Sequence, residues 1–70
     1  MMNMKFSEYD VVKLKVDDAF NNLKAGTEGT IVFVHKSVKS HYEVEFCDDA
    51  GNTLAIVAMS EEKLEKFIPQ

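Results

Sequence analysis

The residues best able to do covalent chemistry in this chain are a single cysteine and two histidines. A thiolate at Cys47 beside the imidazole of His35 or His41 would be a nucleophile with its base. The sequence supplies no third group to orient such a base, and a lone cysteine at a strand end more often packs as a small apolar residue. The same residues, with Asp48 or Asp49, match no closed four-ligand metal pattern. We therefore expect no enzymatic activity, no metal and no cofactor.

Carboxylates form a more extensive set of polar groups. Glu43 and Glu45 lie two residues apart on an alternating segment, so both project from one strand face at a spacing of about 7 Å. Other acidic residues follow this segment or lie in an earlier connection. The set comprises Asp17, Asp18, Glu43, Glu45, Asp48 and Asp49. One interpretation is a solvated face whose charges discourage edge pairing, and the other is a patch that docks a basic protein. Glycosidase-like work by Glu43 and Glu45 is disfavoured, because so small a domain has no deep cleft to shift one carboxyl pKa.

The net charge of −4 and the absence of arginine argue against a nucleic-acid partner. Lys36, Lys39 and His41 make the only basic cluster. Phe33 and Tyr9 are the only aromatic residues that we expect to be available for stacking on bases.

Length and composition favour one soluble domain. Seventy residues allow a single domain over 1–70, in which we take 1–6 as an N-terminal extension. The longest apolar runs, 31–34 and 54–59, are far shorter than a membrane span, and the N-terminus has no secretory pattern. One cysteine excludes an internal disulfide, which favours a reducing, cytoplasmic location.

Period-two patterns predict five strands over 10–16, 30–35, 41–47, 53–59 and 64–68. Val12, Leu14 and Val16 should share the inner face of the first strand. Tyr42, Val44 and Phe46 should do the same in the third, with Glu43, Glu45 and Cys47 outside. In the fourth strand Leu54, Ile56 and Ala58 share one face, and Ala55, Val57 and Met59 share the other.

The connections also carry structural signals. Phe20 and Leu23, three residues apart, are predicted to tuck under the sheet. Either glycine of 26–29 can take a positive φ, and 48–52 should close a hairpin. Ser60 with two following glutamates predicts a helical turn before the last strand, and Pro69 ends strand pairing after it.

This order predicts an all-β fold, a small five-stranded SH3-like barrel with one short helical turn before the last strand. The second and fourth strands are apolar on both faces. The outward side must be covered by the first connection, by the N-terminal segment or by another chain, so a homodimer is one possibility.

Three segments carry a resemblance to a known family: Leu23-x-x-Gly26-x-x-Gly29-Thr30-x-Val32, then Tyr42-x-Val44-Glu45-Phe46, then Gly51-x-Thr53-x-Ala55-x-Val57. They resemble the short bacterial proteins grouped as domain of unknown function 4926, over about residues 9–67. The resemblance implies an SH3-like barrel encoded near toxin loci, with no established activity and no catalytic residues to transfer.

These observations together favour a non-enzymatic protein-interaction module, an immunity or antitoxin-type protein that blocks a basic toxin or nuclease. The residues predicted to bind this partner are Asp17, Asp18, Glu43, Glu45, Asp48, Asp49 and Phe33. The alternative is a KOW-like module associated with RNA or the ribosome, using Lys36, Lys39 and the 26–29 turn. A regulatory domain of a cytoplasmic enzyme would differ from the first reading only in its partner.

Overall fold

Five antiparallel strands form one sheet in the order β4-β3-β2-β1-β5. The structure is a computed structural model that describes residues 5–37 and 40–68. The strands are β1 (Val11–Leu14), β2 (Glu28–His35), β3 (His41–Cys47), β4 (Thr53–Ser60) and β5 (Leu64–Lys66), and the 3₁₀ turn η1 (Glu61–Lys63) precedes β5. The predicted all-β class, the five strands and the single helical turn are therefore confirmed.

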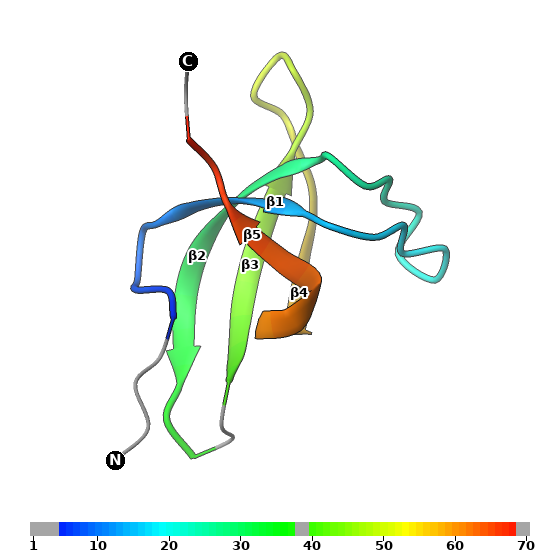
Figure 1. Cartoon of the computed structure of the whole chain (residues 1–70). Helices are drawn as coiled ribbons and strands as arrows, with labels where there is room; N and C mark the ends of the chain where they lie inside the picture. Colours follow the sequence, from blue (N-terminus) through cyan, green and yellow to red (C-terminus); the bar gives the residue numbers. More distant parts are fainter. Residues whose placement is uncertain (1–4, 38–39, 69–70) are drawn as a thin grey trace.

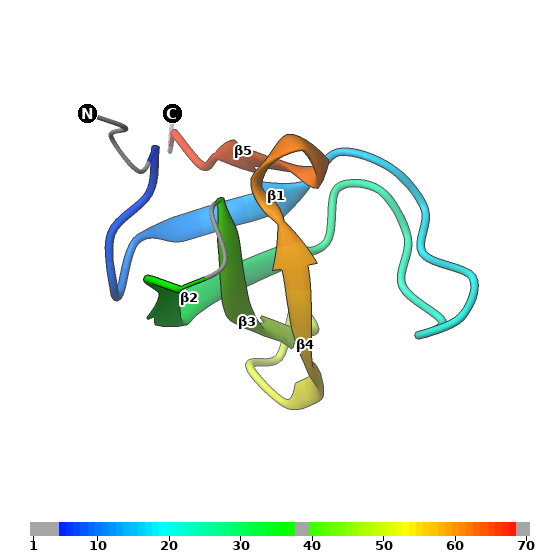
Figure 2. The same ribbon diagram turned by 90° about the horizontal axis from the view of Figure 1, so that it is seen from below.

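The predicted closure into a barrel is wrong. β4 and β5 are the two edges of the sheet, and the strand pairs of the described residues do not join them. The sheet instead bends strongly, so that β1 and β5 cross the direction of β3 and β4 (Figures 1 and 2). An open, bent sheet still encloses a core, because its two halves fold over the same inward side chains.

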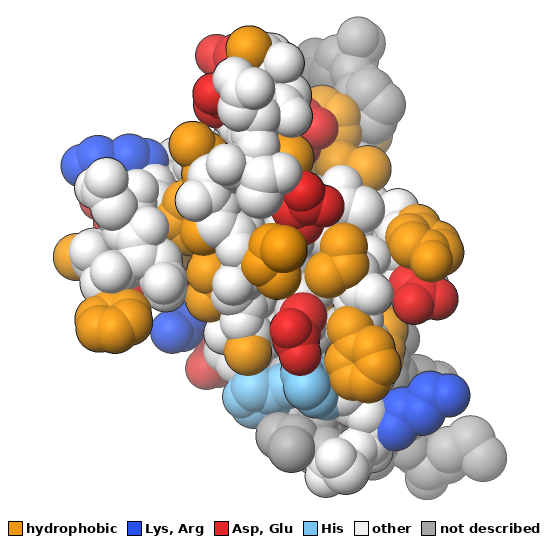
Figure 3. Space-filling view, turned by 180° about the vertical axis from the view of Figure 1, so that it is seen from behind, with side chains coloured by type: hydrophobic (Ala, Val, Ile, Leu, Met, Phe, Trp, Pro, Cys, Tyr) orange, Lys and Arg blue, Asp and Glu red, His pale blue; other side chains and the backbone are white. Residues whose placement is uncertain are grey.

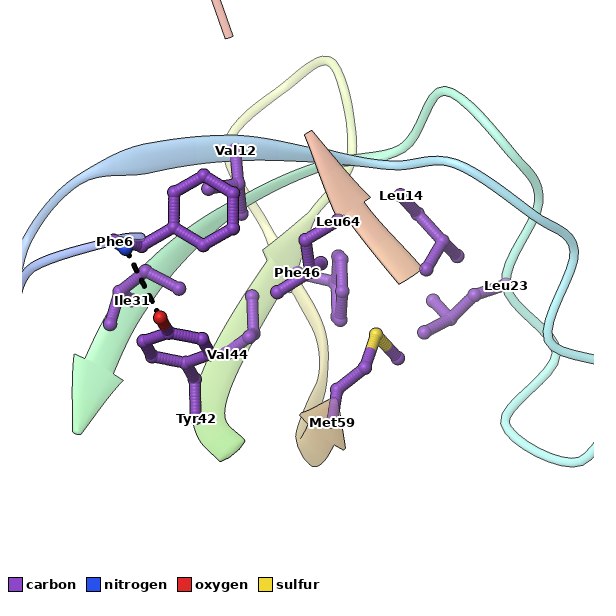
Figure 4. Close-up of a cluster of buried hydrophobic side chains, with 10 residues drawn as sticks. All are labelled: Phe6, Val12, Leu14, Leu23, Ile31, Tyr42, Val44, Phe46, Met59 and Leu64. Atoms are coloured by element: carbon purple, nitrogen blue, oxygen red, sulfur yellow. Dashed lines mark hydrogen bonds between the residues drawn. The ribbon is translucent and has the colours of Figure 1, made fainter. Parts of the chain in front are cut away.

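The core consists of side chains that the bent sheet encloses together with two residues from outside the strands (Figure 4). Its members are Phe6, Val12, Leu14, Leu23, Ile31, Tyr42, Val44, Phe46, Met59 and Leu64. The alternation predicted for β3 is confirmed, since Tyr42, Val44 and Phe46 are all fully buried.

The inner face predicted for the first strand is correct only in part. Val12 and Leu14 are buried, but β1 ends at Leu14, and Val16 is 48% exposed. The next residue, Asp17, already belongs to the loop, where its side chain accepts a hydrogen bond from the backbone N–H of Ala25. The chain therefore leaves the sheet before the alternation can carry Val16 into the core.

A β-bulge in β2 explains how this strand uses apolar residues on both faces. The register with β3 shifts between Ile31, which pairs with Val44, and Phe33, which pairs with Glu43. The extra residue, Val32, reverses the alternation beyond it. Ile31 is therefore buried, Phe33 points outward at 50% exposure, and Val34 packs against the core.

In β4 the inward face is the one that carries Met59. Met59 is buried and Val57 packs against the core, whereas Leu54, Ile56 and Ala58 are exposed. The sequence establishes the two faces of this strand but not which one faces inward, because both are apolar.

The prediction for the connection between β1 and β2 is correct for one of its two apolar residues. Leu23 is buried, but Phe20 is 96% exposed rather than tucked under the sheet. Asp18 and Leu23 pair with each other through both backbone hydrogen bonds, at 2.8 and 2.9 Å. This pairing turns Leu23 inward and leaves Phe20 at the tip of the loop.

The two glycines of the 26–29 segment have different roles. Gly26 takes a φ of +93°, the conformation that the turn requires. Gly29 lies inside β2 without a positive φ, and a Cβ there would come within 2.7 Å of Val44 Cγ1 and 2.9 Å of Phe46 Cδ1. Gly29 therefore lets the side chains of Val44 and Phe46 pack directly against the backbone of β2.

Phe6, the last residue of the predicted N-terminal extension, is buried in the core. Its ring meets Tyr42 edge-on with centroids 5.6 Å apart, and its backbone N–H donates to Tyr42 Oη at 3.1 Å. The Tyr42 hydroxyl in turn donates to the Glu61 carboxylate, which also accepts the Lys5 backbone N–H at 2.9 Å. The Ser60 side chain forms no capping hydrogen bond at the start of η1. The contacts of Glu61 connect this turn to the N-terminal segment. Pro69 lies outside the described residues.

Candidate functional site

The outward side chains of β2, β3 and β4 make one continuous face, which we call the outer face. The strand register places Phe33, Glu43 and Ala58 in one row across it. Thr30, Glu45 and Ile56 form the next row. Seen from behind the sheet, hydrophobic side chains lie on this side of the molecule with acidic side chains between them (Figure 3).

The outer face carries large apolar side chains that are exposed to solvent. Phe33, Leu54 and Ile56 are 50%, 52% and 60% exposed. Each comes from a strand, so the backbone holds it at a fixed position. Clustered exposed apolar side chains on a rigid element are typical of a surface that a partner covers.

The two predicted glutamates of the face are brought together and held by their neighbours. Glu43 lies 3.1 Å from His35 Nε2, and Glu45 accepts a hydrogen bond from the Thr53 hydroxyl. The side chain of Glu43 is still 41% exposed. Both carboxylates therefore have a set orientation and remain able to meet a cation from outside, which gives the face a negative centre with apolar surroundings.

The aspartates of the β3–β4 turn play a local structural part. Asp48 accepts hydrogen bonds from the backbone N–H groups of Ala50 and Asn52 and from the Asn52 side chain, at 2.9 to 3.2 Å. Hydrogen bonds from Asn52 hold the pKa of Asp48 below its ordinary value. Gly51, at a φ of +87°, completes the predicted hairpin, and Asp49 is exposed beside it.

The aspartates of the β1–β2 connection also fix a loop. Asp17 accepts the Ala25 N–H at 2.8 Å, and Asp18 accepts the Asn21 N–H and side-chain amide at 3.1 and 2.8 Å. Hydrogen bonding from Asn21 lowers the pKa of Asp18. This connection and the β3–β4 turn are separate loops in Figure 1. The predicted acidic set therefore divides among the outer face, a turn and a loop rather than forming one patch.

Phe20 is a candidate binding residue that sequence reasoning assigned to the wrong environment. It is 96% exposed at the tip of a turn in which the Asn22 N–H donates to the Ala19 carbonyl at 3.2 Å. Asp18 bonds to the following Asn21 and so fixes the same turn. The Asp and Asn residues on both sides of Phe20 are the signal that could have identified it as a turn residue. An exposed aromatic ring on a braced turn can insert into a partner's pocket at low cost in conformational entropy.

The structure does not place Cys47 beside either histidine. Cys47 and His41 are the two ends of β3, about 20 Å apart at the usual rise per residue. His35 is occupied by Glu43 and contacts the Phe33 ring edge-on at 5.0 Å. Among residues 5–37 and 40–68, no group of three or more His, Cys, Asp or Glu side chains could hold a metal ion. No helix in that part of the chain is long and apolar enough to cross a membrane.

Comparison with known protein families gives a match over most of the chain. The family model described as a domain of unknown function (DUF4926) matches residues 8–66, so it covers all five strands and leaves the core residue Phe6 outside. Neither the curated proteins nor the solved structures include a match to this chain.

Proposed function

We propose that this chain, which belongs to the family described as domain of unknown function DUF4926, is a non-enzymatic protein-binding module of immunity or antitoxin type. Its outer face docks a basic protein, such as a toxin that acts on nucleic acid, and blocks that protein's active site. The observation that carries the proposal is the arrangement of exposed Phe33 and Ile56 around Glu43 and Glu45 on three adjoining strands.

Apolar and acidic groups contribute differently to such docking. Covering Phe33, Leu54 and Ile56 supplies most of the affinity, since affinity comes mainly from a few desolvated anchors. Glu43 and Glu45 supply orientation by accepting hydrogen bonds from lysine or arginine side chains of the partner. The net charge of −4 speeds the encounter with a positively charged protein.

Residues outside the face extend the contact. Phe20 offers a second anchor, and Asp49 adds negative charge at the end of β3. Asp17, Asp18 and Asp48 act mainly by holding their loops in shape. The single cysteine cannot form a disulfide within the chain. Small domains in oxidising compartments commonly depend on disulfides, so a cytoplasmic location fits the proposed module better.

The test is to co-express this chain with a positively charged protein that an adjacent gene encodes, and then to carry out a pull-down and a growth assay. We expect a complex and relief of that product's toxicity. Ile56→Asp should abolish both, because it places a charge where the partner buries an apolar side chain. Val16→Asp is the matched control, since Val16 is similarly exposed but lies outside the face.

Absence of a complex and of relief from toxicity would overturn the proposal. Binding of RNA by the purified protein, with the salt sensitivity of phosphate contacts, would favour the KOW-like alternative instead. In that alternative Lys36, which is exposed, would contact the phosphates, whereas Lys39 lies outside the described residues.

A further inference from the structure

The two edges of the sheet differ in how they are protected against pairing. β5 is three residues long and carries Glu65 and Lys66, which are common devices for blunting an edge. β4 is eight residues long and contains neither a charged residue nor proline. Long, uncharged edge strands are templates for pairing with another strand.

Backbone groups on the free edge of β4 are directed away from the molecule. The Glu61 N–H donates to the Ser40 carbonyl at 2.8 Å, and in an antiparallel ladder such bonded pairs alternate with unbonded ones. Following the register back along β4 places the N–H and C=O groups of Ile56 and Ala58 on the side opposite β3. The hydrogen bonds found among the described residues give these four groups no partner.

We propose that the free edge of β4 pairs with β4 of a second copy of this chain, antiparallel about a twofold axis at Val57. In this register Ile56 of each copy exchanges hydrogen bonds with Ala58 of the other, and Leu54 lies opposite Ser60. The one irregularity of the β3–β4 ladder, the shift after Phe46, lies at the Leu54 end and leaves the strand regular from Ala55 onward.

Self-pairing suits this strand because of its side chains. A twofold axis places two identical strands side by side, so charges on this strand would lie close to charges of the same sign on the other copy. Residues 53–60 carry no charge and therefore meet no such repulsion. Pairing also adds cover to half-buried Val57 on the inner side, and it extends the outer face from one copy to the next.

The short edge of β5 makes a head-to-tail assembly less favourable. A β4 edge that joined β5 of another copy would find three residues to pair with, two of them charged. The twofold arrangement instead offers each β4 a strand as long as itself, so we infer a closed dimer rather than a ring or filament.

The experiment is sedimentation equilibrium on the purified chain alone, from about 1 μM to about 1 mM, a range that covers weak interfaces. We expect a reversible shift from the 7.9 kDa monomer to a dimer with a dissociation constant between about 10 μM and about 1 mM. Added salt should tighten the dimer several-fold, because it screens the repulsion between two copies of net charge −4. Docking of a basic protein should weaken with salt, so the two kinds of association are distinguishable.

Two variants test the edge directly. Ala58→Pro removes one outward-pointing N–H while leaving the bonds to β3 intact, and Ile56→Lys places a charge at the edge. Each should weaken the dimer by at least about tenfold, whereas Val16→Lys, a matched change away from β4, should not. Far-UV circular dichroism checks that the variants fold, and the exposed Ile56 is the safer of the two sites.

A chain that stays monomeric at about 1 mM, a dimer unaffected by Ala58→Pro, or an assembly larger than a dimer would each overturn the inference. Ala58→Pro leaves Phe33, Glu43 and Ile56 in place. A result against the dimer therefore leaves the proposed docking of a basic protein untouched, and the reverse also holds.

Discussion

Replacing Tyr42 with phenylalanine tests whether the N-terminal segment and η1 are joined to the core through one hydroxyl. The hydroxyl donates to the Glu61 carboxylate and accepts the Phe6 N–H at 3.1 Å, while the ring itself is fully buried. Tyr42→Phe preserves the packing of the ring and removes both bonds. Any loss of stability therefore reports on the polar contacts alone.

The expected loss follows from the two contacts. A hydrogen bond to a charged group contributes roughly 1.5–3 kcal/mol, and a buried N–H left without a partner costs roughly 1–3 kcal/mol. Partial access of water to the Glu61 side reduces the sum, so we expect a decrease of about 2–4 kcal/mol in the free energy of unfolding. A chain of 70 residues has only roughly 4–10 kcal/mol in total, so the variant should be clearly destabilised.

The measurement is urea unfolding followed by far-UV circular dichroism, because the chain has no tryptophan and the substitution removes one of its two tyrosines. Tyr9→Phe is the matched control, since Tyr9 is 73% exposed and should change stability by less than about 0.5 kcal/mol. A double-mutant cycle with Glu61→Gln should give a coupling energy of about 1–2 kcal/mol. If Tyr42→Phe unfolds within about 0.5 kcal/mol of the parent chain, the hydroxyl does not join these segments and the reasoning fails.

Three further results are expected. Gly29→Ala should lower the free energy of unfolding by about 1–3 kcal/mol in urea titrations, because its Cβ would meet Val44 Cγ1 at 2.7 Å, and an unchanged midpoint would contradict this close packing. The hydrogen bond from Tyr42 lowers the pKa of Glu61 below its ordinary value, so the stability it contributes is present above that ordinary pKa and is lost as the pH falls through the folded-state pKa. Urea midpoints between pH 7 and pH 3 should therefore fall less steeply in Glu61→Gln, and parallel curves would refute the linkage. Phe20→Ser should leave the free energy of unfolding within about 0.5 kcal/mol of the parent but weaken binding of the basic partner about tenfold, and a stability loss without a binding loss would return Phe20 to a structural role.

Local sequence patterns predict those parts of the fold that local physics determines. β3 alternates strictly, so the burial of Tyr42, Val44 and Phe46 follows from period two alone. The 48–52 hairpin follows from residues whose side chains and backbone favour turns. No competing interaction overrides the pattern at either place.

Other features depend on contacts between distant segments, which spacing cannot reveal. The bulge at Val32 changes which face Phe33 occupies, and it arises from pairing with β3 rather than from any residue that signals a bulge. Phe6 is a core residue because it reaches Tyr42, 36 positions away. The failure of β4 to pair with β5 likewise reflects how the whole sheet bends.

The candidate site combines both kinds of feature. Glu43 and Glu45 are outward because of the regular alternation in β3, and the sequence predicts their position correctly. Phe33 reaches the same face only because the bulge reverses the alternation beyond Ile31, where an unbroken strand would have buried it. Without the bulge the outer face would keep its carboxylates and lose its aromatic residue. The backbone irregularity in β2 is thus what places an aromatic side chain beside Glu43.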